Sequence, residues 1–330
     1  MSIGETGVAS ISPAPAEPAA IVADPVIAVR GVSKHYGTVR AVDGVDLAIG
    51  RGELFGLIGH NGAGKSTLFR MMLGLIPATA GEILIDGENA GGRGFRPVRR
   101  KIGYLPENVV LYDNLTGLET LQFFARLKGA PAQECQRTLR LVGLADAGNR
   151  RVREYSKGMR QRLGFAQALL GNPRILFLDE PTVGLDPEGI REVYAILRAL
   201  RDAGVTVVLS SHILAEIQER VDRIAILVAG RIRALGTVQA LRERIDLPLW
   251  FDLRIAAGQL DHVRRALDHL SLVAIEVRDE RVSLQCRRES KMAVIEALSA
   301  LRGRVLDLQV REPSLEDVFF GYSDRVGAWN

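Results

Sequence analysis

The clearest chemical signal in the sequence is a glycine-rich segment that ends in a lysine and a serine. Residues 59–66 read Gly-His-Asn-Gly-Ala-Gly-Lys-Ser and match the pattern G-x-x-x-x-G-K-[ST]. Glycines at 62 and 64 let successive backbone N–H groups face one anion, and a helix starting at Lys65 directs its positive end to the same point. We therefore expect Lys65 to reach the β- and γ-phosphates of a nucleotide, and Ser66 to offer its hydroxyl to Mg²⁺. The predicted nucleotide-binding residues of this segment are Gly59, Asn61, Gly62, Ala63, Gly64, Lys65, Ser66 and Thr67.

Two acids follow an apolar, strand-like run farther along the chain. Residues 175–178 lead directly into Asp179 and Glu180, and ligands of open α/β sheets bind at the carboxyl ends of the strands. Asp179 would hold Mg²⁺, whereas Glu180 would orient and activate the water that attacks the terminal phosphate. The alternative is an acidic pair that ends a strand in solvent, and the phosphate loop argues against it.

A histidine is expected at the same sheet edge. His212 comes shortly after the apolar run 205–209, so its imidazole would be able to contact the γ-phosphate and report its loss. Lys65, Glu180 and His212 are the predicted catalytic residues.

Composition limits the class of protein. The 330 residues are 47% hydrophobic, which can supply packed cores for one large and one smaller domain. No apolar run approaches the roughly 18 residues of a membrane helix. Cys135 and Cys286 stand far apart, which predicts neither a disulfide nor a zinc site and fits a reducing cytoplasm. Net charge is only +4, and the basic clusters lack a recognition helix or stacking platform, so we expect no nucleic-acid partner.

Hydrophobic periodicity predicts an α/β protein with a second, smaller domain. Antiparallel strands at 26–32 and 42–49 precede β-type runs that alternate with helical patterns, and this alternation indicates a parallel sheet covered by helices. The predicted segments are a disordered Ala/Pro-rich tail at 1–24, a nucleotide-binding domain at 25–245 with a helical subdomain at about 108–171, and an accessory or regulatory domain at 246–330.

The last domain has its own pattern of elements. The order strand, helix, strand, strand, helix, strand is the split βαβ arrangement of a small α+β, ferredoxin-like domain. The predicted elements are 249–255, 260–270, 272–277, 282–286, 291–301 and 305–310. Cys286 shares the apolar face of its strand, which indicates a buried thiol. Ser314 begins a capping-box pattern that predicts a short final helix.

Residues 155–162, Tyr-Ser-Lys-Gly-Met-Arg-Gln-Arg, resemble the signature of ABC ATPases, commonly LSGGQ followed by a Gln/Arg-rich helix start. Over about 26–236 the order of motifs is also similar to that family. Tyr36 takes the place of the aromatic residue that stacks on adenine, Glu107 that of the Q-loop residue, and 184–186 that of the D-loop. The resemblance implies a P-loop NTPase with a mixed sheet and a helical subdomain, which uses ATP and Mg²⁺ and couples ATP hydrolysis to transmembrane transport.

The resemblance also implies partners. Two subunits would pack head to tail as a homodimer, so that the Ser156 hydroxyl and the Gly158 N–H of one contact the γ-phosphate held by Lys65 of the other. A separate integral membrane permease would respond to the opening and closing of this dimer. The chain would thus be cytoplasmic and peripheral on the inner face of the cell membrane.

Three positions depart from the family pattern. Lys157 and Met159 replace the usual Gly and Gln of the signature, and Glu107 replaces Gln. Ser156 and Gly158, which make the implied contacts, remain. A carboxylate at Glu107 is still able to ligate Mg²⁺ or water, and the alternative is an exposed loop acid.

Four stretches are similar to one group within the family, the ATPase of the copper-processing transporter that matures nitrous-oxide reductase. They are 103–109, 123–130, 155–170 and 179–187. In that group a separate permease and a periplasmic maturation factor complete the complex, and copper specificity would belong to those partners, because this chain has no copper-binding pattern. The alternative is the ATPase of a drug or lipid exporter, since residues 313–319 are similar to the endings of such subunits. A non-transport ABC protein that acts on ribosomes or DNA, or an inactive binding module, is less well supported.

Overall fold

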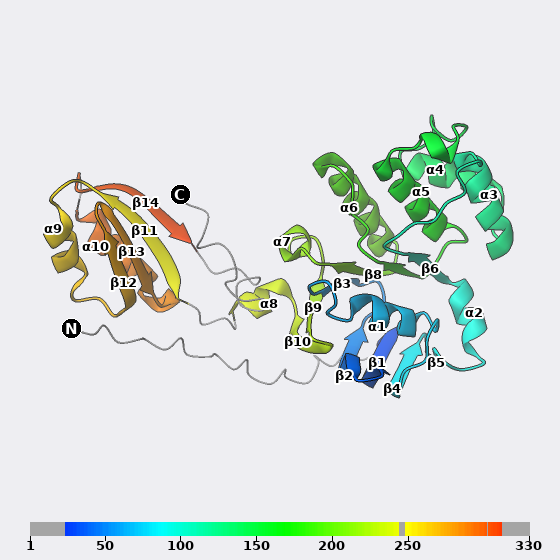
Figure 1. Cartoon of the computed structure of the whole chain (residues 1–330), viewed down its shortest axis with the longest axis horizontal. Coiled ribbons are helices and arrows are strands. Elements are labelled where there is room, and N and C mark those ends of the chain that lie inside the picture. Colours follow the sequence, from blue (N-terminus) through cyan, green and yellow to red (C-terminus); the bar gives the residue numbers. More distant parts are fainter. Residues whose placement is uncertain (1–23, 244–247, 302, 312–330) are drawn as a thin grey trace. The chain divides into compact units, whose positions relative to one another are not determined.

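The structure is a computed structural model that describes residues 24–243, 248–301 and 303–311. The chain divides into two compact units, with the division after Val238 (Figure 1). The predicted tail at 1–24 (except Asp24), the predicted domain boundary at 245 and the capping-box pattern at Ser314 lie outside the described residues. Among the helices of the described part, none has the length and apolar character that a membrane span requires.

The first unit contains an antiparallel sheet in the order β2-β1-β4-β5. The strands predicted at 26–32 and 42–49 are confirmed, and both extend to a tight hairpin at Gly37, whose φ of 57° suits glycine. The four strands are β1 (Ile27–Tyr36), β2 (Val39–Ile49), β4 (Ala80–Ile85) and β5 (Glu88–Asn89).

A six-stranded sheet in the order β10-β9-β3-β8-β7-β6 forms the rest of the framework. Every pairing is parallel except that of β9 with β10, so the sheet is mixed. The strands are β3 (Leu54–Ile58), β6 (Ile102–Leu105), β7 (Ile175–Leu178), β8 (Thr206–Ser211), β9 (Arg223–Val228) and β10 (Arg231–Gly236). Because β8 lies between β3 and β7, the segments that follow these three strands emerge side by side at one edge.

Helices connect and cover the strands. They are α1 (Lys65–Met72), α2 (Phe95–Arg100), α3 (Gly117–Lys128), α4 (Gln133–Leu141), α5 (Lys157–Leu169), α6 (Pro187–Asp202) and α7 (Leu214–Ile217). A further helix, α8 (Val238–Glu243), starts at the division between the two units. Figure 1 shows α3, α4 and α5 grouped beside β6, and the amphipathic helices predicted at 118–127 and 134–141 correspond to α3 and α4. A capping box starts α3, because Thr116 Oγ1 accepts from the backbone N–H of Glu119 and the Glu119 carboxylate accepts from that of Thr116.

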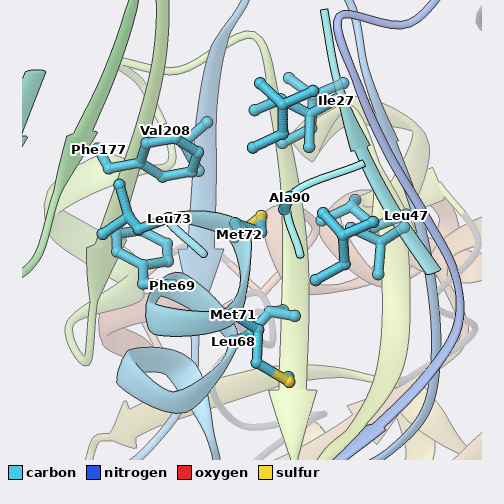
Figure 2. Packing of buried hydrophobic residues seen from close by; sticks show 14 of the residues in the cluster. Ile27, Leu47, Leu68, Phe69, Met71, Met72, Leu73, Ala90, Phe177 and Val208 are labelled. Atoms are coloured by element: carbon cyan, nitrogen blue, oxygen red, sulfur yellow. The ribbon is translucent and has the colours of Figure 1, made fainter. Parts of the chain in front are cut away.

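In the core of the first unit, buried apolar side chains pack α1 against the sheet. Figure 2 shows Phe69 of α1 and Leu73, the C-cap residue of α1, beside Phe177 of β7 and Val208 of β8. The rings of Phe69 and Phe177 meet edge to face, with centroids 5.5 Å apart. This packing fixes the start of α1 relative to the end of β7.

The second unit is a four-stranded antiparallel sheet with two helices. Its strand order, β12-β13-β11-β14, and its element order are those of a ferredoxin-like fold. The predicted elements are confirmed to within a few residues at their ends: β11 (Leu249–Ile255), α9 (Leu260–Leu267), β12 (Leu272–Arg278), β13 (Arg281–Cys286), α10 (Lys291–Ser299) and β14 (Val305–Arg311). Leucines and valines of the helices pack on alternate residues of β11 and β13, and Cys286 is fully buried there, as predicted.

Candidate nucleotide-binding site

The loop between β3 and α1 bends sharply, and its glycines make the bend possible. Gly62 and Gly64 have φ values of 82° and 108°, which residues with a Cβ rarely adopt. A Cβ on Gly64 would also lie 2.3 Å from the carbonyl oxygen of Ala41. Helix α1 begins at Lys65, and no side chain caps its first turn. The N-terminal N–H groups of α1 are therefore directed into the loop, where residues 60–63 and 227–229 line a pocket of about 170 Å³.

Lys65 lies inside this bend rather than in solvent, with only 6% of its surface exposed. Its Nζ donates to the carbonyl oxygen of Gly59 at 2.5 Å and lies 3.4 Å from Oε1 of Glu180. The ammonium group is thus held between the phosphate loop and the acids that follow β7. A terminal phosphate in the loop would lie within reach of the same group.

The acids at the end of β7 are fixed by a serine from the neighbouring strand. Ser210 Oγ donates to Oδ1 of Asp179 at 2.6 Å and accepts from the backbone N–H of Glu180 at 2.9 Å. Glu180 has a φ of 53°, which is uncommon for a residue with a side chain. Ser210 is not among the residues predicted from the sequence. A signal for it exists, since it belongs to a polar Ser-Ser-His ending on an otherwise apolar strand.

Each oxygen of the Glu180 carboxylate lies next to a different side chain. Its Oε2 lies 2.8 Å from Nδ1 of His212, which follows β8. Its Oε1 is buried and, among the residues that the structure describes, has no hydrogen-bond partner, although the Lys65 ammonium lies 3.4 Å away. An unpartnered buried carboxylate oxygen is costly, and it is the kind of acceptor that orients a water molecule. The structure thus brings Lys65, Glu180 and His212 together, as the sequence analysis expected.

The signature segment forms the start of α5. Ser156 is the N-cap residue, and its Oγ accepts from the backbone N–H of Met159 at 3.2 Å, so that its own hydroxyl hydrogen stays free to donate. Ser156 and Lys157 are exposed. A second residue that the sequence analysis missed, Gln161, is buried and donates to the carbonyl oxygen of Pro181 at 3.2 Å. This contact ties the signature helix to the segment that follows Glu180.

Comparisons with known proteins agree with this arrangement. A family model described as ABC transporter matches residues 42–183. A daunorubicin-resistance ATP-binding protein of Streptomyces coeruleorubidus is 38% identical over 90% of this chain and 96% of its own length. A bacitracin transport ATP-binding protein of Bacillus licheniformis is 35% identical over 89% and 96%, respectively. This chain belongs to the ABC transporter family.

The chain is an ATP-binding and ATP-hydrolysing subunit of that family. A solved dimeric ATP-binding cassette in a post-hydrolysis state, with ADP and Pi bound, is 28% identical to it. The match covers 64% of this chain and 98% of that one, with a TM-score of 0.60. Such ABC subunits typically form dimers that pair with a membrane permease.

Other residues expected at the ATP site are found around it. Tyr36 ends β1 and is 48% exposed, with the Lys34 ammonium 5.3 Å from its ring centroid. Asn61 is exposed at the loop, whereas Ala63 is buried and Thr67 half-buried in α1. The stacking of adenine on Tyr36 stays a prediction.

Glu107 lies just beyond the end of β6, which pairs with β7. Burial raises the pKa of the hydroxyl of Tyr104 in β6; the negative charges of Asp179 and Glu107 also raise it, whereas the positive charge of Arg70 lowers it. Glu107 is exposed. The structure thus places Glu107 in contact with solvent, and its predicted binding of Mg²⁺ stays a prediction.

The residues present fit a magnesium ion that is shared with a nucleotide. Within the described ranges, no group of three or more His, Cys, Asp or Glu residues could hold a metal by itself. Mg²⁺ keeps several waters and binds through one or two carboxylates together with substrate phosphates. Asp179, nearly buried and oriented by Ser210, and the Ser66 hydroxyl would be its protein ligands. The ion would supply positive charge to the phosphate oxygens.

Proposed function

We propose that this chain is the motor of an exporter that removes a drug or antibiotic from the cell. The observation that carries the proposal is the extent of the match to relatives named for daunorubicin resistance and bacitracin transport. A match over about nine-tenths of the chain must include much of the second unit, because the first ends at Val238. The likeness therefore goes beyond the ATPase unit that all ABC subunits share.

In the proposed reaction, the glycine loop and Lys65 hold the β- and γ-phosphates of ATP. Glu180 accepts a proton or hydrogen bond from the attacking water through Oε1, its unpartnered oxygen. His212 keeps the carboxylate in place through Oε2, and Lys65 balances its charge. Phosphoryl transfer needs positioning and charge stabilisation more than covalent catalysis, and these groups provide both.

We also propose that two copies close each nucleotide site together. Ser156 and Gly158 lie at the N-terminus of α5, where the Ser156 side chain is exposed and its hydroxyl hydrogen is not used by the cap. A helix N-terminus with a hydroxyl donor suits a phosphate oxygen. ATP shared between one loop and the other copy's α5 would join the copies, and hydrolysis would release them. This dimer would act on a separate permease from the cytoplasmic face of the membrane.

A second candidate is the motor of the copper-processing transporter of nitrous-oxide reductase maturation. The four stretches 103–109, 123–130, 155–170 and 179–187 favour it. Both candidates use the same ATP chemistry, and they differ in partners. Of the two candidates, only the copper transporter would include a periplasmic maturation factor in its complex.

The experiment that separates the candidates is to purify the chain with its native membrane partner and reconstitute the complex in vesicles. For an exporter, daunorubicin or bacitracin should stimulate ATP turnover severalfold and accumulate in vesicles on the side opposite the ATPase. Copurification of a periplasmic protein, with turnover that responds to neither compound, would favour the copper transporter instead.

A further inference from the structure

The first unit has a second pocket, larger than the one at the phosphate loop. It has a volume of about 900 Å³ and lies among the starts of β6, β7 and β8, the turn before β3, and helix α4. We propose that this pocket binds a small phosphorylated molecule with an apolar body. We call it the basic pocket, because five basic residues line it: Arg51, Lys101, Arg137, Arg140 and Arg174.

The basic pocket is separate from the ATP site. Lys101 and Arg174 immediately precede β6 and β7, and Thr206 begins β8, whereas Glu180 and His212 follow the other ends of β7 and β8. A strand rises about 3.3 Å per residue, so the length of β8 alone places the two sites roughly 15–20 Å apart.

Positive charge in the basic pocket greatly exceeds negative charge. Asp86 is the one acid among the lining residues, and Arg51 forms a salt bridge with it at 2.7 Å. The pKa of Asp86 is lowered first by that hydrogen bond, and also by the charges of Lys101 and Arg174. Those two side chains therefore lie close enough to act on the same carboxylate.

The other four cations form no salt bridge with an acid in the described part of the chain, although the charges of Lys101 and Arg174 act on Asp86. Arg137 donates to the neutral amide oxygen of Asn172 at 2.9 Å, so its charge is held in place without being neutralised. In the described part of the chain, Lys101, Arg140 and Arg174 form no salt bridge. Cations gathered in this way repel one another, and a bound anion would turn that repulsion into attraction.

The shape and lining of the pocket define the ligand further. Val98, Leu169 and Ile175 are nearly buried and form apolar parts of the lining, and Leu141 adds an apolar wall that is 48% exposed. Pockets of roughly 300–1,000 Å³ with apolar linings and a few polar groups suit whole organic molecules. Guanidinium groups match phosphate oxygens in a two-pronged geometry. A free inorganic phosphate would use the charges and leave the apolar lining without a partner.

Flavin mononucleotide is a suitable probe, because it combines a flat apolar ring system with one phosphate, and riboflavin is the same molecule without the phosphate. Binding would be measured by calorimetry on the full chain with saturating ADP, so that the ATP site is blocked. We expect one flavin mononucleotide per chain, with riboflavin and inorganic phosphate each binding at least about tenfold more weakly.

Substitutions test whether flavin mononucleotide binds in the basic pocket. Arg140→Ala combined with Arg174→Ala should lower the affinity for flavin mononucleotide by about tenfold or more. Arg174→Gln, a milder change, should lower the affinity by a smaller factor. Arg93→Ala, at an exposed arginine outside the pocket, should leave the affinity unchanged. Thermal melting confirms that each variant folds. The proposal is overturned if no saturable binding occurs beside ADP, if riboflavin binds equally well, or if the pocket variants bind like wild type.

Discussion

Nδ1 of His212 lies 2.8 Å from Oε2 of Glu180, and this contact joins the segments that follow β8 and β7. The sequence predicts a contact of His212 with the γ-phosphate, and the structure shows the Glu180 carboxylate as a partner of its ring. In a neutral imidazole only one nitrogen carries hydrogen. If Nδ1 donates to Glu180, a hydrogen bond from Nε2 to a phosphate oxygen requires the ring to be protonated. We therefore predict that the first role of His212 is to orient the carboxylate.

Glu180→Gln should bind ATP and nearly abolish its hydrolysis, by about 100-fold or more. The amide keeps the size of the side chain and the contact with His212, but it cannot accept a proton from water. Phosphate release measures turnover, and light scattering in Mg-ATP should show an accumulated dimer. Turnover at the wild-type rate would remove Glu180 from its assigned role.

His212→Ala should lower ATP turnover by up to roughly 100-fold, because a reacting group displaced by about 1 Å can lose that much rate. ATP affinity, measured with a fluorescent nucleotide, should change little, since the loop and Lys65 are untouched. His269→Ala, at an exposed histidine in the second unit, is the matched control and should behave as wild type. A loss of affinity equal to the loss of rate would place His212 in nucleotide binding instead.

The sequence was sufficient to predict that Lys65, Asp179, Glu180 and His212 gather at one edge. Each follows an apolar run of strand length, and parallel strands present their carboxyl ends together. The apolar runs also predicted the elements of the second unit.

The hydrogen bonds that Ser210 and Gln161 form at the site were not predictable in the same way. Ser210 joins Asp179 to Glu180 only because β8 lies between β3 and β7, and strand order depends on long-range pairing that the periodicity of one chain does not encode. Gln161 belongs to the signature motif in the sequence, whereas its hydrogen bond to the carbonyl oxygen of Pro181 depends on how α5 packs.

Ser156→Asp tests the shared site without removing the helix cap. Asp, Asn and Ser are about equally good N-cap residues, so α5 should still begin at Lys157. A carboxylate facing the γ-phosphate of the other copy would repel it. In the Glu180→Gln background, Ser156→Asp should therefore prevent the ATP-dependent dimer seen by light scattering, although each monomer still binds ATP.

Ser156→Asn is the neutral control for this change, and it should retain the dimer at least in part. Equal dimerisation of the Asp and Asn variants would show that Ser156 does not meet a phosphate across an interface.

Gly103→Ala should destabilise the first unit through packing alone. Gly103 lies in β6, and a Cβ there would come within 2.2 Å of the Ala168 carbonyl oxygen in α5 and 2.6 Å of the Leu176 side chain in β7. Neither the helix backbone nor the sheet can yield cheaply, so we expect a loss of about 1–3 kcal/mol in the free energy of unfolding by urea. Gly91→Ala is the matched control, since its nearest neighbour, Asn89 Oδ1, would be 3.4 Å away, and it should change stability by less than about 0.5 kcal/mol. If both variants unfold at the same urea concentration, α5 and β6 are not packed as closely as the structure shows. Because α5 carries Ser156 and β6 leads to Glu107, the same variant should also lower ATP turnover at temperatures where it remains folded.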